Sequence, residues 1–200
     1  MQVTRSGLRS TACNLGLALL FFASLLPFHS SGVADQIWIV GAVLMGFLML
    51  IRQPSKAVTI TTSALIATGI SMVLPLMMTP DHPSRGPMAI AGIGVEITGV
   101  IVGQGSRLYL GRRFALLPAN RGVVTGGPFR FVRHPIYLGW LILSIGYVMA
   151  YPALRNAAIV MAVLQAILWR IHQEEALLAA ESDYREYLAR TPWRLVPLIY

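Results

Sequence analysis

Two polar stretches, about forty residues apart, hold most of the side chains that could do chemistry in this sequence. The first is GGPFRFVRHPIYLGW (126–140), where two arginines and a histidine directly precede an apolar run. The second is RIHQEE (170–175), where two adjacent carboxylates follow another apolar run. Carboxylates are unfavourable at the negative end of a helix dipole, so a compensating cation is expected there. Arg170, four residues before Glu174, would supply it as an ordinary helical ion pair, and a bound cationic ligand is the functional alternative.

The dipeptide His134-Pro135 marks the entry to the apolar run after the first stretch. A proline at the first position of a helix sacrifices no hydrogen bond, and it holds the preceding residue in an extended conformation. The two glycines before Pro128 allow the backbone to approach a ligand closely, and free N–H groups at a helix start can bind a polar or anionic group. The alternative is that these basic and aromatic residues only anchor the chain at a membrane interface.

The composition is that of an integral membrane protein. Hydrophobic residues make up 56% of the 200 positions and charged residues only 12%, against about a quarter charged in soluble domains. We therefore expect an all-α fold, a polytopic membrane bundle of about six transmembrane helices with an amphipathic C-terminal helix. The expected spans are Asn14–Phe28, Ile37–Ile51, Ala57–Met78, Met88–Gly103, Ile136–Tyr151 and Leu154–Ile171.

The basic residues favour one orientation of this bundle. With six spans and both termini in the cytoplasm, every lysine and arginine except Arg85 and Arg155 falls in a cytoplasmic segment, as the positive-inside rule requires. The net charge of +8 is then mostly topological, and its scatter along the chain argues against nucleic-acid binding. All but one of the 16 basic residues are arginine, which points weakly to a bacterial inner membrane.

Two further features of the sequence limit the interpretation. Cys13 is the one cysteine, so neither an internal disulfide nor a cysteine-based metal site is expected. The basic start, the first apolar run and the sequence SGVA before Asp35 also resemble a cleavable secretory signal, and this alternative stays open. The oligomeric state is not indicated.

The chain divides by charge into two parts. Residues 1–103 form an N-terminal bundle of four spans with few ionisable groups, whereas residues 104–200 hold a basic connector, a hairpin of two spans and a polar tail. Because the legs of the hairpin have similar lengths, His134 and the stretch 170–175 should meet on one surface. Apolar residues recur at helical spacing in the tail, which predicts an amphipathic helix that ends at Pro192.

The two stretches and the tail together resemble a known family. VVTGGPFRFVRHPIYLGW, followed by RIHQEEALLAAESDYREYLARTPWRLVP, is similar over residues 99–197 to the isoprenylcysteine carboxyl methyltransferases and their bacterial relatives. The shared features are G-P-[FY]-R, R-H-P-x-Y-x-G, R-x4-E with E-E-x-x-L, and Y-x-x-Y. The resemblance implies an integral membrane enzyme that binds S-adenosylmethionine in a cytoplasm-facing pocket built from the connector, the hairpin and the tail.

The resemblance also implies roles for individual residues. The donor's adenosine would lie against Val124, Gly127, Pro128 and the backbone around Phe129. The rim of the donor site would be formed by His134, Tyr137 and Gly139. Glu174 would bind the donor's ammonium or ribose, and the R-x4-E pair Arg170 and Glu175 would be the catalytic residues beside the methyl-accepting group. No metal site is implied.

We expect methylation of a lipophilic acceptor held in the bilayer, most simply the carboxylate of an isoprenylcysteine-like molecule, with membrane lipids as surroundings. A carboxylate is ionised near neutral pH and needs no base, and Arg170 would hold it. Methylation of a lipid amine, as in the phospholipid N-methyltransferases that resemble the same half, would need Glu175 to take up a proton. A nicotinamide-dependent reductase and a non-catalytic membrane protein are the remaining alternatives.

The fourth expected span contains two features with open interpretations. Glu96 lies near its middle, where a charge is costly, so this residue is either functional or part of polar packing within the bundle. The span also carries a series of small residues, which could leave a lipid-facing groove for the acceptor or could allow close helix packing. These small residues are Ala91, Gly92, Gly94, Gly99 and Gly103.

Overall fold

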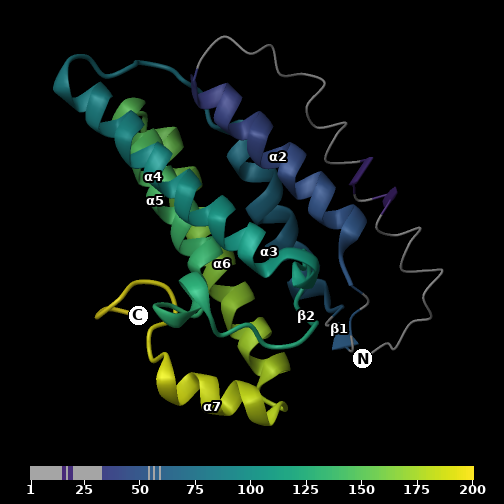
Figure 1. Ribbon diagram of the computed structural model, residues 1–200. Helices are drawn as coiled ribbons and strands as arrows, with labels where there is room; N and C mark the ends of the chain where they lie inside the picture. The colour runs from purple at the N-terminus through teal and green to yellow at the C-terminus, as the bar shows by residue number, and fades with distance from the viewer. Residues whose placement is uncertain (1–14, 17, 20–32, 54, 56, 59) are drawn as a thin grey trace.

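The computed structural model describes residues 15, 16, 18, 19, 33–53, 55, 57, 58 and 60–200 (Figure 1). The first expected span, Asn14–Phe28, lies mostly outside the described residues, whereas the possible cleavage point before Asp35 lies in the described segment that begins at Val33, where the structure does not test cleavage. The helices are α2 (Val33–Ile51), α3 (Thr62–Val73), α4 (Pro87–Leu110), α5 (Pro135–Ala150), α6 (Leu154–Leu178) and α7 (Ser182–Arg190). Short 3-10 turns are η1 (Leu74–Met77), η2 (Gly111–Arg113) and η3 (Gly127–Arg130).

Several helix ends follow directly from the sequence. Pro135 stands at the first position of α5, as the His134-Pro135 dipeptide predicts, and α6 begins at the expected residue. Two helices are longer than expected: α4 continues past Gly103 to Leu110, and α6 continues to Leu178. The two adjacent glutamates therefore lie within the last turns of α6 and not after it. The amphipathic tail helix is α7, which ends before Pro192.

The expectation of one continuous span over Ala57–Met78 was wrong. Its first residues form a strand, β1 (Ala57–Val58), which pairs antiparallel with β2 (Ala119–Asn120) in the connector. Helix α3 begins only at Thr62, where the side chain of Thr61 accepts a hydrogen bond from the backbone N–H of Ala64 at 3.2 Å. The fold is thus helical apart from this small ribbon, which ties the connector to the segment before α3.

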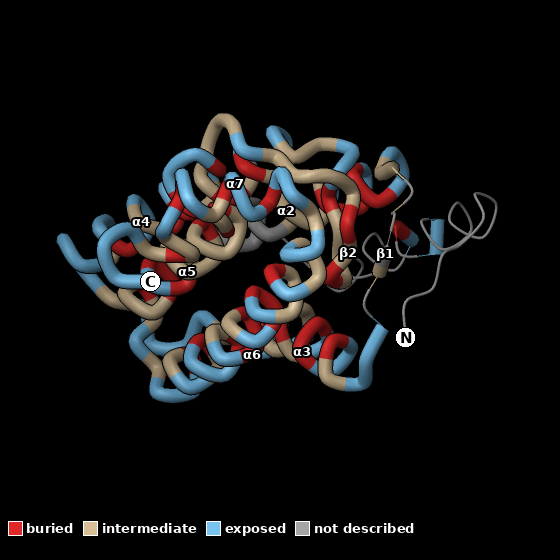
Figure 2. The backbone as a smooth tube through the Cα atoms, turned by 90° about the horizontal axis from the view of Figure 1, so that it is seen from below, coloured by how far each residue is buried: buried red, intermediate tan, exposed pale blue. Residues whose placement is uncertain are grey.

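Two described helices, Pro87–Arg113 and Leu154–Leu178, are long and apolar enough to cross a membrane, and the predicted count of six spans is not confirmed. The outward faces of these helices are apolar as well as exposed. Ile90 and Ile101 on α4 are 73% and 67% exposed, and Leu154 and Met161 on α6 are 87% and 64% exposed. Seen from below, exposed residues follow the outer sides of the helices and buried ones face inward (Figure 2). Exposed apolar surface of this extent suits contact with lipid.

Helix α5 lies along α4, as Figure 1 shows, and this contact is far more extensive than that between α5 and α6. Small residues bring the two backbones together: a Cβ on Gly99 would stand 2.7 Å from Leu143 Cα, and one on Gly139 would stand 2.8 Å from Gly99 O. Of the two interpretations left open for these small residues, close helix packing therefore holds at Gly99, because α5 fills the space that a lipid-facing groove would need. Gly94 faces away from α5, and a Cβ added to it would have no neighbouring atom within 4 Å.

The remaining small residues of α4 and Glu96 also divide into residues that face α5 and residues that are exposed. Gly92 also meets the α5 backbone, Gly103 lies within ordinary contact distance of Gly139, and Ala91 is exposed. Glu96 is 3% exposed and packs against Gly146 of α5. Its carboxyl group is therefore enclosed between these helices and does not line the cavity described below.

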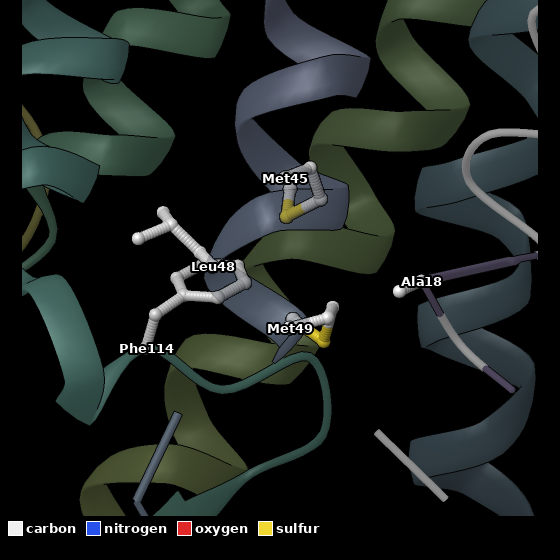
Figure 3. Close-up of a cluster of buried hydrophobic side chains, with 5 residues drawn as sticks. All are labelled: Ala18, Met45, Leu48, Met49 and Phe114. Carbon is white, nitrogen blue, oxygen red and sulfur yellow. The ribbon is translucent and has the colours of Figure 1, made fainter. Parts of the chain in front are cut away.

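A small apolar cluster fixes the connector on α2. Met45, Leu48 and Met49 of α2 contact Phe114, which follows η2, and Ala18 completes the cluster (Figure 3). A second cluster holds α7 against the segment before α5 through Phe129, Tyr184 and Tyr187. Residues of the connector and of the tail helix line one cavity.

Candidate functional site

The cavity lies where the ends of α4 and α6 meet the connector, the start of α5 and α7. The cavity is open to solvent, and the space within it and its mouth is about 1050 Å³. Six of the residues predicted for the site line it. They are Val124, Phe129, His134, Tyr137, Arg170 and Glu174.

The other four predicted residues do not line the cavity. Gly127 has a φ of +55° and packs against the ring of Tyr109, so its glycine is required by a close approach within the chain. Pro128 follows it in η3. Gly139 lies in the contact between α4 and α5, and Glu175 lies behind the cavity wall. Their predicted roles toward a ligand stay predictions.

Glu175 is the centre of a buried ionic cluster. Its Oε1 lies 3.2 Å from Arg133 Nη1 and 3.4 Å from His134 Nε2, and its Oε2 accepts a hydrogen bond from Arg194 Nε at 2.9 Å. The cation expected beside the two glutamates is thus supplied by the α5 entry and the C-terminal tail. The convergence of His134 with the end of α6 is confirmed.

The backbone strengthens the same junction. The N–H groups of Arg133 and His134 donate to the carbonyls of Trp193 and Arg194, each at 2.9 Å. Arg133 Nε also donates to the carbonyl of Thr191 at 2.7 Å. The tail after α7 therefore folds back onto the segment that precedes α5, and it closes this side of the cavity.

Glu174, one position before the cluster's centre, faces the cavity. Its Oε1 accepts a hydrogen bond from the phenol of Tyr137 at 2.5 Å, and its Oε2 lies 3.8 Å from His134 Nδ1. The rings of Tyr137 and His134 stack with centroids 5.7 Å apart. Arg170 Nη2 is 3.9 Å from Glu174, so the predicted helical ion pair is present but long.

Arg170 is held by hydrogen bonds from both of its Nη atoms. Its Nη1 donates to Ser71 Oγ at 2.8 Å and its Nη2 to the carbonyl of Leu116 at 2.6 Å. The guanidinium carbon stands 5.4 Å from the centre of the Tyr137 ring. Its Nε is buried and finds no hydrogen-bond partner within the described part of the chain. A ligand acceptor in the cavity can satisfy this group.

The cavity residues that were not predicted as site residues include two tyrosines and three arginines of particular interest. Tyr184 and Tyr187 of α7 form part of the wall, although the sequence suggested only an amphipathic face. The Tyr187 hydroxyl donates to the carbonyl of Phe129 at 2.5 Å, and burial raises its pKa to about 12. Burial also raises the pKa of Tyr184, whose hydroxyl has no hydrogen-bond partner among the residues described. Both phenols therefore stay protonated donors at neutral pH.

The three arginines are Arg107, Arg113 and Arg121, which also line the cavity. Their charges fit the positive-inside rule, so nothing in the sequence distinguishes them from the other arginines. Arg121 Nε donates to the carbonyl of Gln53 at 2.7 Å. Burial, together with the nearby charge of Arg52, lowers the pKa of Arg121 to about 10. An arginine at each of several walls makes the cavity attractive to anionic groups.

The fold and the cavity define a class: a helical membrane protein with an internal site that combines one carboxylate, several guanidinium groups and aromatic rings. Residues 100–180 match the model of the isoprenylcysteine carboxyl methyltransferase (ICMT) family. This match confirms the resemblance noted in the sequence and supports an assignment of the chain as a methyltransferase.

A curated relative and a solved structure agree with this assignment. The chain is 27% identical over 163 residues to protein-S-isoprenylcysteine O-methyltransferase A of Arabidopsis thaliana, covering 78% of this chain and 79% of the relative. It also shares its fold with the eukaryotic intramembrane Ras methyltransferase ICMT, at 23% identity and a TM-score of 0.51. That superposition covers 94% of this chain and 75% of the solved one.

Proposed function

We propose that this protein transfers the methyl group of S-adenosylmethionine to the carboxylate of an S-isoprenylated cysteine or a similar lipophilic acceptor. The observation that carries the proposal is the wall formed by Glu174, Tyr137 and Arg170, in which a carboxylate and a guanidinium flank one aromatic ring. A cationic donor and an anionic acceptor need these two opposite charges close together. The family and the named activity of the curated relative support the same reaction.

The donor's groups match one side of the cavity. Glu174 offers a carboxylate for the ammonium of the donor, and the ring of Tyr137 offers a π-face for the sulfonium cation. Val124, Phe129 and Tyr184 form an apolar and aromatic surface against which an adenine ring can stack. The unpaired Tyr184 hydroxyl is available to the adenosine.

The acceptor's carboxylate is assigned to Arg170. The reaction forms a bond between a carboxylate oxygen and the methyl carbon, and the bond between that carbon and sulfur breaks, which leaves a neutral thioether. No proton moves, because the acceptor is already ionised near neutral pH. Arg170 therefore orients the oxygen through its free Nε, and closure of the cavity removes water from it.

Glu175, predicted as catalytic, is better suited to a positioning role. Arg133, His134 and Arg194 surround its carboxylate, which leaves it poorly placed to take a proton from an amine acceptor. This surrounding favours a carboxylate acceptor over the lipid-amine alternative. Glu175 would instead hold His134 and the tail against the donor.

The two parts of the chain would serve the two substrates. Met45 and Met72, from the N-terminal part (1–103), add apolar surface to a cavity built mostly from residues 104–200. We assign the acceptor's isoprenoid chain to that apolar side and to the bilayer, and the water-soluble donor to the side covered by α7. In the orientation favoured by the positive charges, this cavity faces the cytoplasm and both termini lie there.

Binding of the donor tests the proposal. Purified full-length protein in lipid nanodiscs should bind S-adenosylmethionine and its demethylated product, and a hundredfold excess over Kd should stabilise the fold by about 2.7 kcal/mol. Glu174→Gln should weaken this binding because it removes the countercharge of the donor's ammonium. Glu186→Gln, on the exposed side of α7, is the control. Absence of binding at millimolar donor, or stabilisation by a nicotinamide cofactor instead, would overturn the assignment.

A further inference from the structure

We infer that Arg107 and Arg170 together form a carboxylate-binding site in the cavity, with Arg107 contacting the ligand directly. This inference rests on the proposed function and extends it to a residue that the family motifs in this sequence do not include. The site takes the carboxylate of the acceptor's cysteine end, in line with the assignment of Arg170, and the experiment below distinguishes it from the chemically similar carboxylate of the donor's amino-acid end.

Arg107 lies in the last turn of α4, with its side chain on the cavity. Its Nη1 donates to Gln104 Oε1 at 2.9 Å, which is a neutral partner. Its Nε is buried and has no hydrogen-bond partner among the residues that the structure describes. In that same part of the chain, no carboxylate oxygen lies within 4.0 Å of this guanidinium.

Arg170 reaches the cavity from α6 and, like Arg107, has a buried Nε without a hydrogen-bond partner in the described part of the chain. Its two Nη atoms bind Ser71 and Leu116. Arg107 and Arg170 lie close enough for their positive charges to repel each other, and both charges act on Tyr137. Two residues from different helices therefore line the same cavity, and each has a buried N–H group without a partner in the described part of the chain.

Two like charges close together in a low-dielectric site are unfavourable without an anion to balance them. Glu174 is the one carboxylate in the described cavity lining, and Tyr137 already donates to its Oε1. It lies 3.9 Å from Arg170 and can balance one of the two guanidinium groups. A second carboxylate, brought by a substrate, would balance the other and satisfy both Nε groups.

A purely structural role would not explain why the Nε of Arg107 is buried without a partner in the described part of the chain. A cation in the last turn of a helix offsets the negative end of the helix dipole, and Arg107 is the basic residue of that turn in α4. Such a cation is equally effective on the solvated face of the turn, where its donors can bind water. Burial of the Nε beside a second arginine therefore points to a ligand.

The experiment uses full-length protein in lipid nanodiscs and compares Arg107→Ala and Arg107→Lys with the control Arg112→Ala. Arg112 is exposed, donates to the carbonyl of Ile51, and does not line the cavity. Two pairs of probes differ only in the carboxylate. They are S-adenosylmethionine with its decarboxylated analogue, and an S-isoprenylated cysteine with its methyl ester.

If the donor supplies the carboxylate, Arg107→Ala should weaken S-adenosylmethionine binding about 10- to 100-fold and leave the decarboxylated analogue unchanged. If the acceptor supplies it, the same loss should be confined to the free acid of the prenylated cysteine. Arg107→Lys should recover part of the loss, because lysine keeps the charge without the planar fork.

The inference is overturned if Arg107→Ala binds all four probes as the wild type does. It is also overturned if this variant and Arg107→Lys lose affinity equally for probes with and without the carboxylate, because the role is then structural. Wild-type protein that binds no S-adenosylmethionine would instead overturn the proposed function, so the two failures are distinguishable.

Discussion

Replacing Glu175 with alanine is expected to lower the free energy of unfolding by about 3–5 kcal/mol. The substitution removes the shared partner of Arg133, His134 and Arg194, and it leaves cations buried without a counter-charge. Because these residues join the α5 entry, α6 and the tail, the C-terminal tail should open first. Chemical unfolding in detergent, with proteolysis of the tail as a second readout, measures both effects.

The matched control is Glu186→Ala on the exposed face of α7. Glu186 pairs with Arg190 four residues later, and both side chains are well exposed. An exposed helical pair of this kind contributes at most about 1 kcal/mol. Equal and small losses for the two variants would show that the cluster around Glu175 does not hold the tail in place.

The second large effect concerns the contact between α4 and α5. Alanine substitutions at two glycines of α4 are expected to change the stability of the protein differently. Gly99→Ala should destabilise the protein by about 3 kcal/mol, because the new Cβ would stand 2.7 Å from Leu143 Cα and 2.7 Å from the carbonyl oxygen of Gly139. Gly94→Ala should be neutral or stabilising by up to about 1 kcal/mol, since nothing lies within 4 Å of its added methyl.

Thermal unfolding of the two glycine variants in the same detergent decides between close packing and an open groove. A Gly99→Ala protein as stable as the wild type would mean that α5 does not lie against α4 at this point. The acceptor groove predicted at Gly99 would then return as an explanation of the small residues.

The meeting of His134 with the stretch 170–175 could be predicted from the sequence. It depends only on the 16 residues of α5 and a similar length of α6, up to the start of that stretch, joined by a short turn. The start of α5 was predictable for a local reason as well, since Pro135 suits the first position of a helix. Both predictions use information that lies within a few residues or in helix geometry.

Other features could not be predicted because they depend on distant partners. The strand Ala57–Val58 is too short to show a period, and its partner in the connector lies about sixty residues away. Gly139 was assigned to the rim of the donor site through the family resemblance. In the structure its close neighbour is the backbone of α4.

The sequence also does not show which of the arginines lines the cavity. Arg107 and Arg112 fit the positive-inside rule equally well, yet Arg107 lines the cavity and Arg112 is exposed. Only the rotation of α4 and the path of the connector separate them. A linear sequence gives the number of charges near a membrane surface, whereas the packing decides which of them meets a ligand.

Methyl transfer itself tests the central claim most directly. Full-length protein in lipid nanodiscs is supplied with S-adenosylmethionine labelled on the methyl group and with an S-isoprenylated cysteine that has a free carboxyl group. We predict a labelled, lipid-soluble product that releases labelled methanol on mild base treatment, and no product when the acceptor is already the methyl ester. Label that resists base and appears on a lipid amine, or no transfer at saturating donor, would contradict the account.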